Sequence, residues 1–374
     1  MTTQSARHRT QPATSDRAPL PDRPNPALSR RALLAGTAAG AVGLSLAACG
    51  RSKKKTDSKT VTVVTHDSFH VSDSLKKAFT SETGYTLEIV TSGDAGALVN
   101  KLVLTKDAPL GDAVFGIDNT YASRALDQGV IDTSATVTLP KGAESYVVAD
   151  TPALAPIDVG DVCLNIDTGY FSGKGLTPPA TFEDLTKLEY KGLLVAINPT
   201  NSSPGMAWLL ATIGHFGAGS FADYWKQLVS NDLRIAEDWT SAYETDFSGG
   251  GKGTYPIVVS YASSPSFTVS DDGASSSTSA LLDTAFRQVE YAGVLKGAAN
   301  PEGGKAFVEW MLSKAVQEDI PGQMYMYPVL PDAALPEALT KFGPLSSAPV
   351  SVEPKEITAH REEWLNTWTG AVGK

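Results

Sequence analysis

Carboxylates and aromatic rings recur where short apolar segments of this 374-residue chain end. Asp67, Asp94 and Asp118 each follow a segment of strand-like composition. Aromatic residues occupy comparable positions later in the chain, namely Trp239, Tyr261, Phe267 and Tyr325. Carboxylates attract a cation, and aromatic rings stack on a flat cationic group. The combination predicts a binding site for a cationic aromatic ligand.

A predicted helix start adds a second kind of chemistry. Ser202-Ser203-Pro204-Gly205 precedes the apolar run 206–216, and we expect Ser203 to cap a helix that begins at Pro204. The free N–H groups of a helix N-terminus attract anions such as phosphate. From the residues alone, both an anion site and an ordinary cap on a core helix remain open.

Other reactive residues favour structural interpretations. His66 and His70 are four residues apart, but they follow a strand without a third ligand at suitable spacing, so a hydrogen-bonded turn is favoured over a metal site. Cys163 lies in an apolar strand, which favours a small core residue over a nucleophile. The glycine-rich run 249–254 lacks the Gly-Lys-Ser/Thr order of a phosphate loop. We therefore expect no catalytic residue and no metal site.

The elements that would position these residues alternate in type. Strands are predicted at 60–64, 85–90 and 113–117, with helices between them, which is the order of a parallel α/β sheet. A second block of the same kind follows. Its predicted elements are a strand at 162–166, a helix at 178–188, a strand at 192–197, helices at 206–216 and 221–229, a strand at 233–236, a short helix at 241–247 and a strand at 255–260.

The last part of the chain is predicted to be a loop, a strand and a helical tail. Residues 270–279 are rich in Ser, Asp and Gly and indicate a loop, and 286–295 indicate a strand. The last helix, 356–372, places Trp364 and Trp368 four residues apart, which is more typical of core contacts than of a ligand site. Two α/β blocks in one chain predict two lobes.

The N-terminal 48 residues have the pattern of an export signal. Arg30 and Arg31 precede a short Ala- and Gly-rich run, which indicates a signal peptide of the twin-arginine type. The run ends in small residues before Cys49, which resembles a bacterial lipobox whose cysteine is lipidated. We expect residues 49–59 to form a lipid-anchored linker outside the membrane. A retained membrane-spanning anchor is disfavoured because the run is short.

Composition excludes several classes of protein. The chain is 42% hydrophobic and 19% charged, which argues against wholesale disorder. Its formal net charge of −10 argues against a nucleic-acid partner, since phosphate neutralisation requires clustered Lys and Arg. Two cysteines cannot build a disulfide framework.

Short segments in a fixed order carry a resemblance to a known family. They are Asp67-Ser68-Phe69, the stretch 94–102, Gly116-Ile117-Asp118-Asn119, Ser202-Ser203-Pro204-Gly205, Trp239 with Ala242-Tyr243, the stretch 260–265, Gln288-Val289-Glu290, and Ile320-Pro321 with the stretch 326–329. From about residue 60 to 368 the chain resembles the thiamine-binding proteins of bacterial ABC transporters. The resemblance implies the two-lobed, type II periplasmic binding protein fold.

The resemblance also implies roles for individual residues. Asp94 would hydrogen-bond the aminopyrimidine, Trp239 and Tyr261 would pack against the rings, and Ser202 would take the phosphate of thiamine monophosphate or diphosphate. Tyr325 would stack on the ligand where the family tends to carry Trp. His66 and Phe267 stand where the family commonly has Tyr, so the aromatic enclosure is lighter and the preferred vitamer stays open.

The implied function is capture of thiamine or a thiamine phosphate by a lipid-anchored monomer, which delivers it to a permease driven by a cytoplasmic ATPase. Lobe one would comprise 60–157 and 291–374, lobe two 163–286, and the hinges 158–162 and 287–290. The same fold includes thiamine-degrading transferases with a Cys nucleophile, for which Cys163 is the only residue to consider, and iron-binding proteins. Both remain alternatives.

Overall fold

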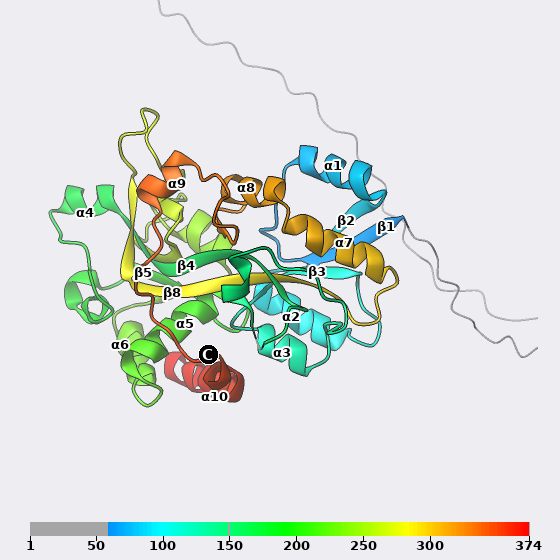
Figure 1. Cartoon of the computed structure of the whole chain (residues 1–374). Helices are drawn as coiled ribbons and strands as arrows, with labels where there is room; N and C mark the ends of the chain where they lie inside the picture. The colour runs from blue at the N-terminus through cyan, green and yellow to red at the C-terminus, as the bar shows by residue number, and fades with distance from the viewer. Residues whose placement is uncertain (1–58, 149, 374) are drawn as a thin grey trace, which may run out of the picture. The chain divides into compact units, whose positions relative to one another are not determined.

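Two long strands, β4 (Ala155–Asp167) and β8 (Thr278–Val294), pair antiparallel and run through the middle of the molecule (Figure 1). The computed structural model describes residues 59–148 and 150–373. The expected signal peptide, Cys49 and all of the linker except residue 59 lie outside this part of the chain. Residues 155–167 are almost wholly buried, although Asp158, Asp161 and Asn165 interrupt the apolar side chains of this strand.

A parallel group of strands extends from each side of the long pair. The sheet order is β2-β1-β3-β8-β4-β7-β5-β6, and β9 (Tyr327–Pro328) pairs with β4. On the β8 side lie β1 (Thr60–Thr65), β2 (Thr86–Thr91) and β3 (Ala113–Asp118). On the β4 side lie β5 (Leu194–Ile197), β6 (Arg234–Ala236) and β7 (Ile257–Tyr261). Both groups are internally parallel, which confirms the expected mainly parallel α/β blocks.

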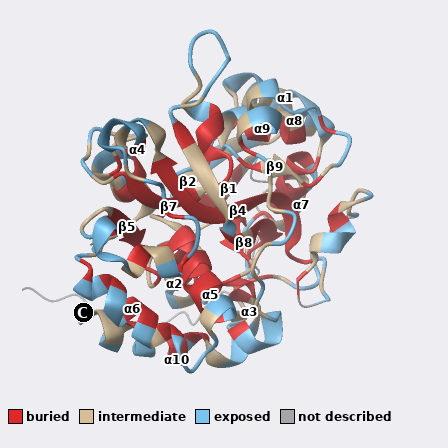
Figure 2. Ribbon diagram, turned by 90° about the vertical axis from the view of Figure 1, so that its left-hand side faces the viewer, coloured by how far each residue is buried: buried red, intermediate tan, exposed pale blue. Residues whose placement is uncertain are grey.

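Helices cover the sheet and leave their outer faces exposed, while the central strands are largely buried and the edge strand β2 is not (Figure 2). The helices are α1 (Asp73–Thr83), α2 (Ala95–Leu104), α3 (Ala122–Asp127), α4 (Thr168–Lys174), α5 (Ser203–Phe216), α6 (Phe221–Ser230), α7 (Pro301–Met311), α8 (Lys314–Gln323), α9 (Glu337–Phe342) and α10 (Pro354–Val372). Shorter helical turns are η1 (Ala143–Tyr146), η2 (Glu183–Thr186), η3 (Leu188–Tyr190), η4 (Ser241–Asp246) and η5 (Ser264–Phe267).

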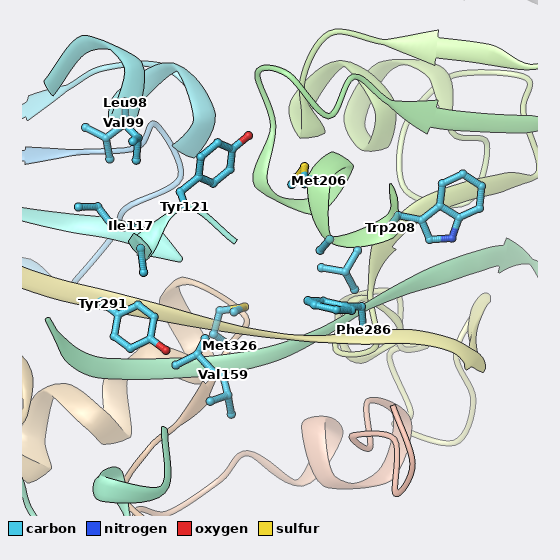
Figure 3. Packing of buried hydrophobic residues seen from close by; sticks show 14 of the residues in the cluster. Leu98, Val99, Ile117, Tyr121, Val159, Met206, Trp208, Phe286, Tyr291 and Met326 are labelled. Carbon is cyan, nitrogen blue, oxygen red and sulfur yellow. The ribbon is translucent and has the colours of Figure 1, made fainter. Parts of the chain in front are cut away.

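The buried side chains of both parallel groups join across β4 and β8 (Figure 3). Trp208 of α5 packs edge-on against Trp225 of α6, with ring centroids 5.1 Å apart. Trp225 in turn meets Trp368 of α10 at 5.6 Å. Trp364 and Trp368 are both buried, which confirms the predicted core role of the C-terminal stripe.

Several predicted boundaries are wrong. The helix expected at 178–188 is replaced by η2 and η3, because the Asp184 carboxylate accepts the N–H groups of Ala180 and Thr181 and closes a local turn. Ser203 is not the cap of α5; the Ser202 side chain accepts the Gly205 N–H instead. Strand β8 begins at Thr278, within the predicted loop.

Candidate functional site

A cavity of about 370 Å³ opens where loops that follow the parallel strands converge. Its walls come from the loop after β1, the start of α2, the start of α5, the residues after β6, the end of β7, the middle of β8 and the loop before β9. Ligands of open α/β sheets bind at the carboxyl ends of the strands, where such loops meet. The cavity therefore has the place and the size of a small-molecule site.

One wall of the cavity is aromatic. The Trp239 indole stacks almost parallel to the Tyr243 ring, with centroids 5.1 Å apart and an interplanar angle of 9°. Its Nε1–H donates to Ser260 Oγ at 2.9 Å, which fixes the ring while leaving one face toward the cavity. Tyr261 donates its hydroxyl to Gln288 Oε1 at 3.3 Å and also lines the cavity. These rings offer flat surfaces that are held before any ligand arrives.

Asp94 supplies an unsatisfied carboxylate oxygen. It is the N-cap of α2, and its Oδ1 accepts the Ala95 N–H at 2.7 Å. Its Oδ2 is buried and has no hydrogen-bond partner among the described residues. Burial raises the pKa of Asp94, and the Ser202 hydroxyl and the Ala95 N–H oppose that rise. A buried acceptor without a partner suits a ligand that brings an N–H donor.

His66 and Glu290 form a second polar pair in the wall. The Ser68 N–H donates to His66 Nδ1 at 3.1 Å, so Nε2 carries the proton and faces Glu290 Oε1 at 3.5 Å. Burial by itself lowers the pKa of His66, but the carboxylates of Glu290, Asp94 and Asp67 together outweigh it, and the net pKa is raised. Gly116, at φ +98°, makes room for this arrangement, since a Cβ there would collide with the imidazole ring.

Buried carboxyl groups continue behind Glu290. Asp118 on β3 and Asp158 on β4 are its direct partners in the register of the sheet. Burial and the nearby Glu290 raise the pKa of Asp158 well above its ordinary value. Burial raises the pKa of Asp118 to about 7, although the Thr120 hydroxyl and N–H oppose it. Glu290 thus stands between the cavity and two carboxyl groups that favour the neutral form.

The structure brings most of the predicted residues together at the cavity. The predicted residues that line it are His66, Asp67, Asp94, Ser203, Trp239, Tyr261 and Tyr325. Asp67 also joins two loops, because its Oδ1 accepts the Gly93 N–H at 2.9 Å. The backbone of Tyr325 adopts φ +64°, in the left-handed region that favours glycine. The ligand-binding roles of these residues stay predictions.

Other predicted residues do not line the cavity. Ser202 is fully buried and uses its hydroxyl within the helix cap, and Gly205 is buried beneath it against the backbone of Ile197 and Asn198. The Asp118 Oδ1 accepts the N–H and hydroxyl of Thr120, each at 2.6 Å. The Phe267 ring lies against the ring of Tyr325 and is 41% exposed.

The sequence argument missed other parts of the wall. They are Glu244, Glu290, Gln323, Met324 and Met326, together with Thr240, Pro204 and the serines of the loops. Glu290 lies within β8, so a search limited to residues after strands could not find it. The signal that was available is the Gln288-Val289-Glu290 segment, in which charged and amide side chains interrupt an apolar strand.

Cys163 lies away from the cavity wall, on β4 opposite Ser260 of β7. The thiol is fully buried, and burial together with Asp161 raises its pKa. Within residues 59–148 and 150–373, no group of three or more His, Cys, Asp and Glu side chains is placed to hold a metal ion. The same residues include no helix that is long and apolar enough to cross a membrane.

One family model and several known proteins match most of this chain. Residues 112–342 match the family described as bacterial extracellular solute-binding protein. A thiamine-binding periplasmic protein of Escherichia coli (strain K12) is 27% identical over 327 residues, covering 84% of this chain and 94% of the relative. One of Brucella suis biovar 1 (strain 1330) is 27% identical over 329 residues, covering 84% and 92%.

Similar solved structures share the fold, and their names give different ligands, iron among them. A periplasmic thiamin binding protein superposes with a TM-score of 0.73 at 25% identity, covering 84% of this chain and 96% of its own. A periplasmic binding protein from Actinobacillus pleuropneumoniae with fructose-6-phosphate bound gives 0.69 at 16% identity, covering 84% and 98%. The second likeness shows the fold alone.

Proposed function

Because the chain belongs to the bacterial extracellular solute-binding proteins and has their type II fold, we propose that it captures thiamine or a thiamine phosphate and delivers it to an ABC importer. The observation that carries this proposal is the buried, unpartnered Asp94 Oδ2 in the wall of a cavity with fixed aromatic faces. The aminopyrimidine of thiamine brings N–H donors, and its thiazolium brings a flat cation. The names of the curated relatives and of the solved structure agree with this ligand.

In this proposal Asp94 accepts the amino group of the pyrimidine. Trp239 and Tyr261 flank the rings, and a desolvated cation–π contact of this kind stabilises a complex by about 2 kcal/mol. The rings pre-exist in place, since Trp239 is held by Ser260 and Tyr261 by Gln288. Such preorganisation reduces the entropy cost of binding. Binding and release require no covalent step.

We further propose that the two blocks move as lobes during capture. Lobe one comprises 60–157 and 291–374, and lobe two comprises 163–286. The connecting segments 158–162 and 287–290 lie side by side in β4 and β8, where Asp158 pairs with Glu290 and Asp161 with Arg287. Bending of two adjacent strands would close the cavity as a hinge.

Delivery places the protein outside the cytoplasm. We propose that residues 1–48 direct export through the paired arginines and that Cys49 carries a lipid anchor on the outer face of the membrane. The partner is a membrane permease with a cytoplasmic ATPase, and the binding protein acts as a monomer without nucleic acid. The alternative function, a thiamine-degrading transferase with a Cys nucleophile, receives no support from Cys163. Its thiol is buried and does not line the cavity.

The proposal is tested on purified protein in two steps. Denaturing mass spectrometry identifies small molecules released from the protein as isolated, and calorimetry of stripped protein measures binding of thiamine and its mono- and diphosphate. We expect saturable binding with one site and a matching rise in thermal stability. Asp94→Asn should weaken binding at least tenfold, whereas Asp223→Asn on the exposed face of α6 should not. Absence of binding to all three compounds would overturn the proposal.

A further inference from the structure

Helix α10 contacts both proposed lobes. In two views it lies between α6 of lobe two and α3 of lobe one (Figure 1 and Figure 2). On one side the Trp368 ring meets Trp225 of α6, with centroids 5.6 Å apart. On the other side Arg361 Cζ lies 4.2 Å from the centroid of the Tyr121 ring, at the start of α3. Among the described residues that line the cavity none belongs to α10, so the helix connects the lobes outside the ligand site.

The segment before α10 is also attached to lobe two. It belongs to residues 291–374, which we assign to lobe one, but the Val350 N–H donates to the Ala285 carbonyl oxygen at 2.7 Å. A Cβ on Gly214 of α5 would lie 2.5 Å from the Val350 side chain, so this segment packs closely on that helix. The contact of Arg361 with Tyr121 therefore joins lobe one to a helix that is anchored on lobe two.

Arg361 is a buried cation whose partners lie mainly in lobe one. It is 4% exposed, and its Nε has no hydrogen-bond partner among the described residues. The Glu362 carboxylate accepts from Arg361 Nη1 at 3.0 Å and from Arg124 Nη1 of α3 at 3.4 Å. Burial raises the pKa of Asp118, and the positive charge of Arg361 is one of the influences that oppose the rise. A buried charge is costly without partners, and the Tyr121 face and the Asp118 carboxyl group supply them here.

Tyr121 extends the contact to the cavity wall. Its hydroxyl donates at 3.1 Å to the carbonyl oxygen of Pro199, in the loop between β5 and α5. In the same loop the Asn201 carbonyl oxygen accepts the Ala97 N–H of α2 at 3.2 Å. Gly96 permits this approach, because a Cβ there would lie 2.6 Å from both the Asn201 oxygen and the Tyr121 hydroxyl. These contacts fix the distance between the starts of α2 and α5, which line the cavity from different lobes.

We propose that α10 is a strap between the lobes, and that Arg361 and Tyr121 are positioning residues for ligand binding. The inference rests on the proposed function and on the proposed movement of the lobes. Their contact stabilises the arrangement in which the starts of α2 and α5 share one cavity, and it is lost when the lobes separate. A contact made only in the binding-competent arrangement raises the apparent affinity by increasing the population of that arrangement. Arg361 and Tyr121 thus act on affinity without touching the ligand.

The first test measures thiamine binding by calorimetry and by stopped-flow fluorescence. Arg361→Met keeps a long side chain and removes the cation, and we expect about tenfold weaker binding through faster dissociation. Arg361→Lys keeps a cation beside the Tyr121 ring and should recover most of the affinity. Lys355→Met, at an exposed position of the same helix, is the matched control and should change neither the affinity nor the dissociation rate.

Small-angle X-ray scattering tests the strap without ligand. Free Arg361→Met should have a larger radius of gyration than the free wild type at an unchanged circular dichroism spectrum, because its lobes separate more often. If that variant fails to fold, Tyr121→Phe replaces it in both tests. Phenylalanine keeps the ring beside Arg361 and removes only the hydroxyl bond to Pro199, and it should weaken thiamine binding about fivefold.

The outcomes separate this inference from the proposed function. Failure of the wild type to bind thiamine or its phosphates would overturn the proposed function, and the scattering comparison would still decide the strap. An unchanged affinity and dissociation rate in a folded variant, or an unchanged radius of gyration, would overturn the strap while leaving thiamine capture intact. Lower stability with unchanged binding would show that Arg361 only supports the fold.

Discussion

Arg287 and Asp161 form a two-point ion pair across β8 and β4. Arg287 Nε lies 2.7 Å from Asp161 Oδ1, and Nη2 lies 2.9 Å from Oδ2. The Asp161 carboxylate is fully buried and also accepts the Ser346 N–H at 2.6 Å. Both residues lie in the two segments that we propose as the hinge. The ion pair therefore fixes the register of β4 against β8, and Asp161 also holds the loop that contains Ser346.

Removing only the arginine should be costly. Arg287→Met leaves a buried carboxylate without its cation, and we expect the free energy of unfolding to fall by about 3 kcal/mol. The double variant with Asp161→Asn removes the uncompensated charge and should recover part of that loss. Urea unfolding of the wild type, both single variants and the double variant measures the coupling. Strictly additive losses would show that the two side chains do not stabilise each other.

The close packing of the His66 imidazole against Gly116 leads to a second prediction. Gly116→Ala places a methyl group against the imidazole at a backbone angle, φ +98°, that side chains rarely adopt. We expect the free energy of unfolding to fall by at least about 2 kcal/mol. Gly173→Ala in α4 is the matched control, because a Cβ there has nothing within 4 Å and should stabilise the helix slightly. Equal melting temperatures for the two variants would contradict the steric account.

Much of the fold could be predicted from sequence because the residue types that mark the ends of strands and helices lie within those elements or next to them. The β-branched runs of β1 and β2 and the glycine and serine punctuation of α2 and α5 mark their own boundaries to within a few residues. Residues that follow a strand in the chain also lie at its carboxyl end in space. The sequence alone therefore predicts that Asp94, Trp239 and Tyr261 lie near one another, and all three line the cavity.

The features that could not be predicted from sequence depend on pairing between strands that are far apart in the chain. Glu290 reaches the cavity because β8 pairs with both β3 and β4, and no local pattern contains that register. The composition around Thr278 predicts a loop. This residue belongs to β8 because its backbone pairs with Asp167 of β4, which is far away in the chain. The predicted helix at 178–188 failed for a local reason, a carboxylate that competes for backbone N–H groups.

Asp118 provides a pH-dependent prediction. Its pKa is raised to about 7 by burial, so the folded state holds this proton more tightly than the unfolded chain does. The stability from this group is complete below an ordinary aspartate pKa of about 4 and is lost as the pH rises through about 7. We expect Asp118→Asn to remove this component, at up to about 1.4 kcal/mol per pH unit. Urea unfolding between pH 5 and 8 measures it, and parallel profiles for the two proteins would refute it.

Trp239 tests the aromatic wall itself. Trp239→Ala removes the ring that stacks on Tyr243, and the loss of about 2 kcal/mol predicts roughly 30-fold weaker thiamine binding. Because the side chain is only partly buried, the circular dichroism spectrum and melting temperature should change little. Trp239→Phe keeps a flat face but loses the indole hydrogen bond to Ser260, so it should recover most of the affinity. Unchanged affinity in the alanine variant, measured by calorimetry, would move the ligand away from this wall.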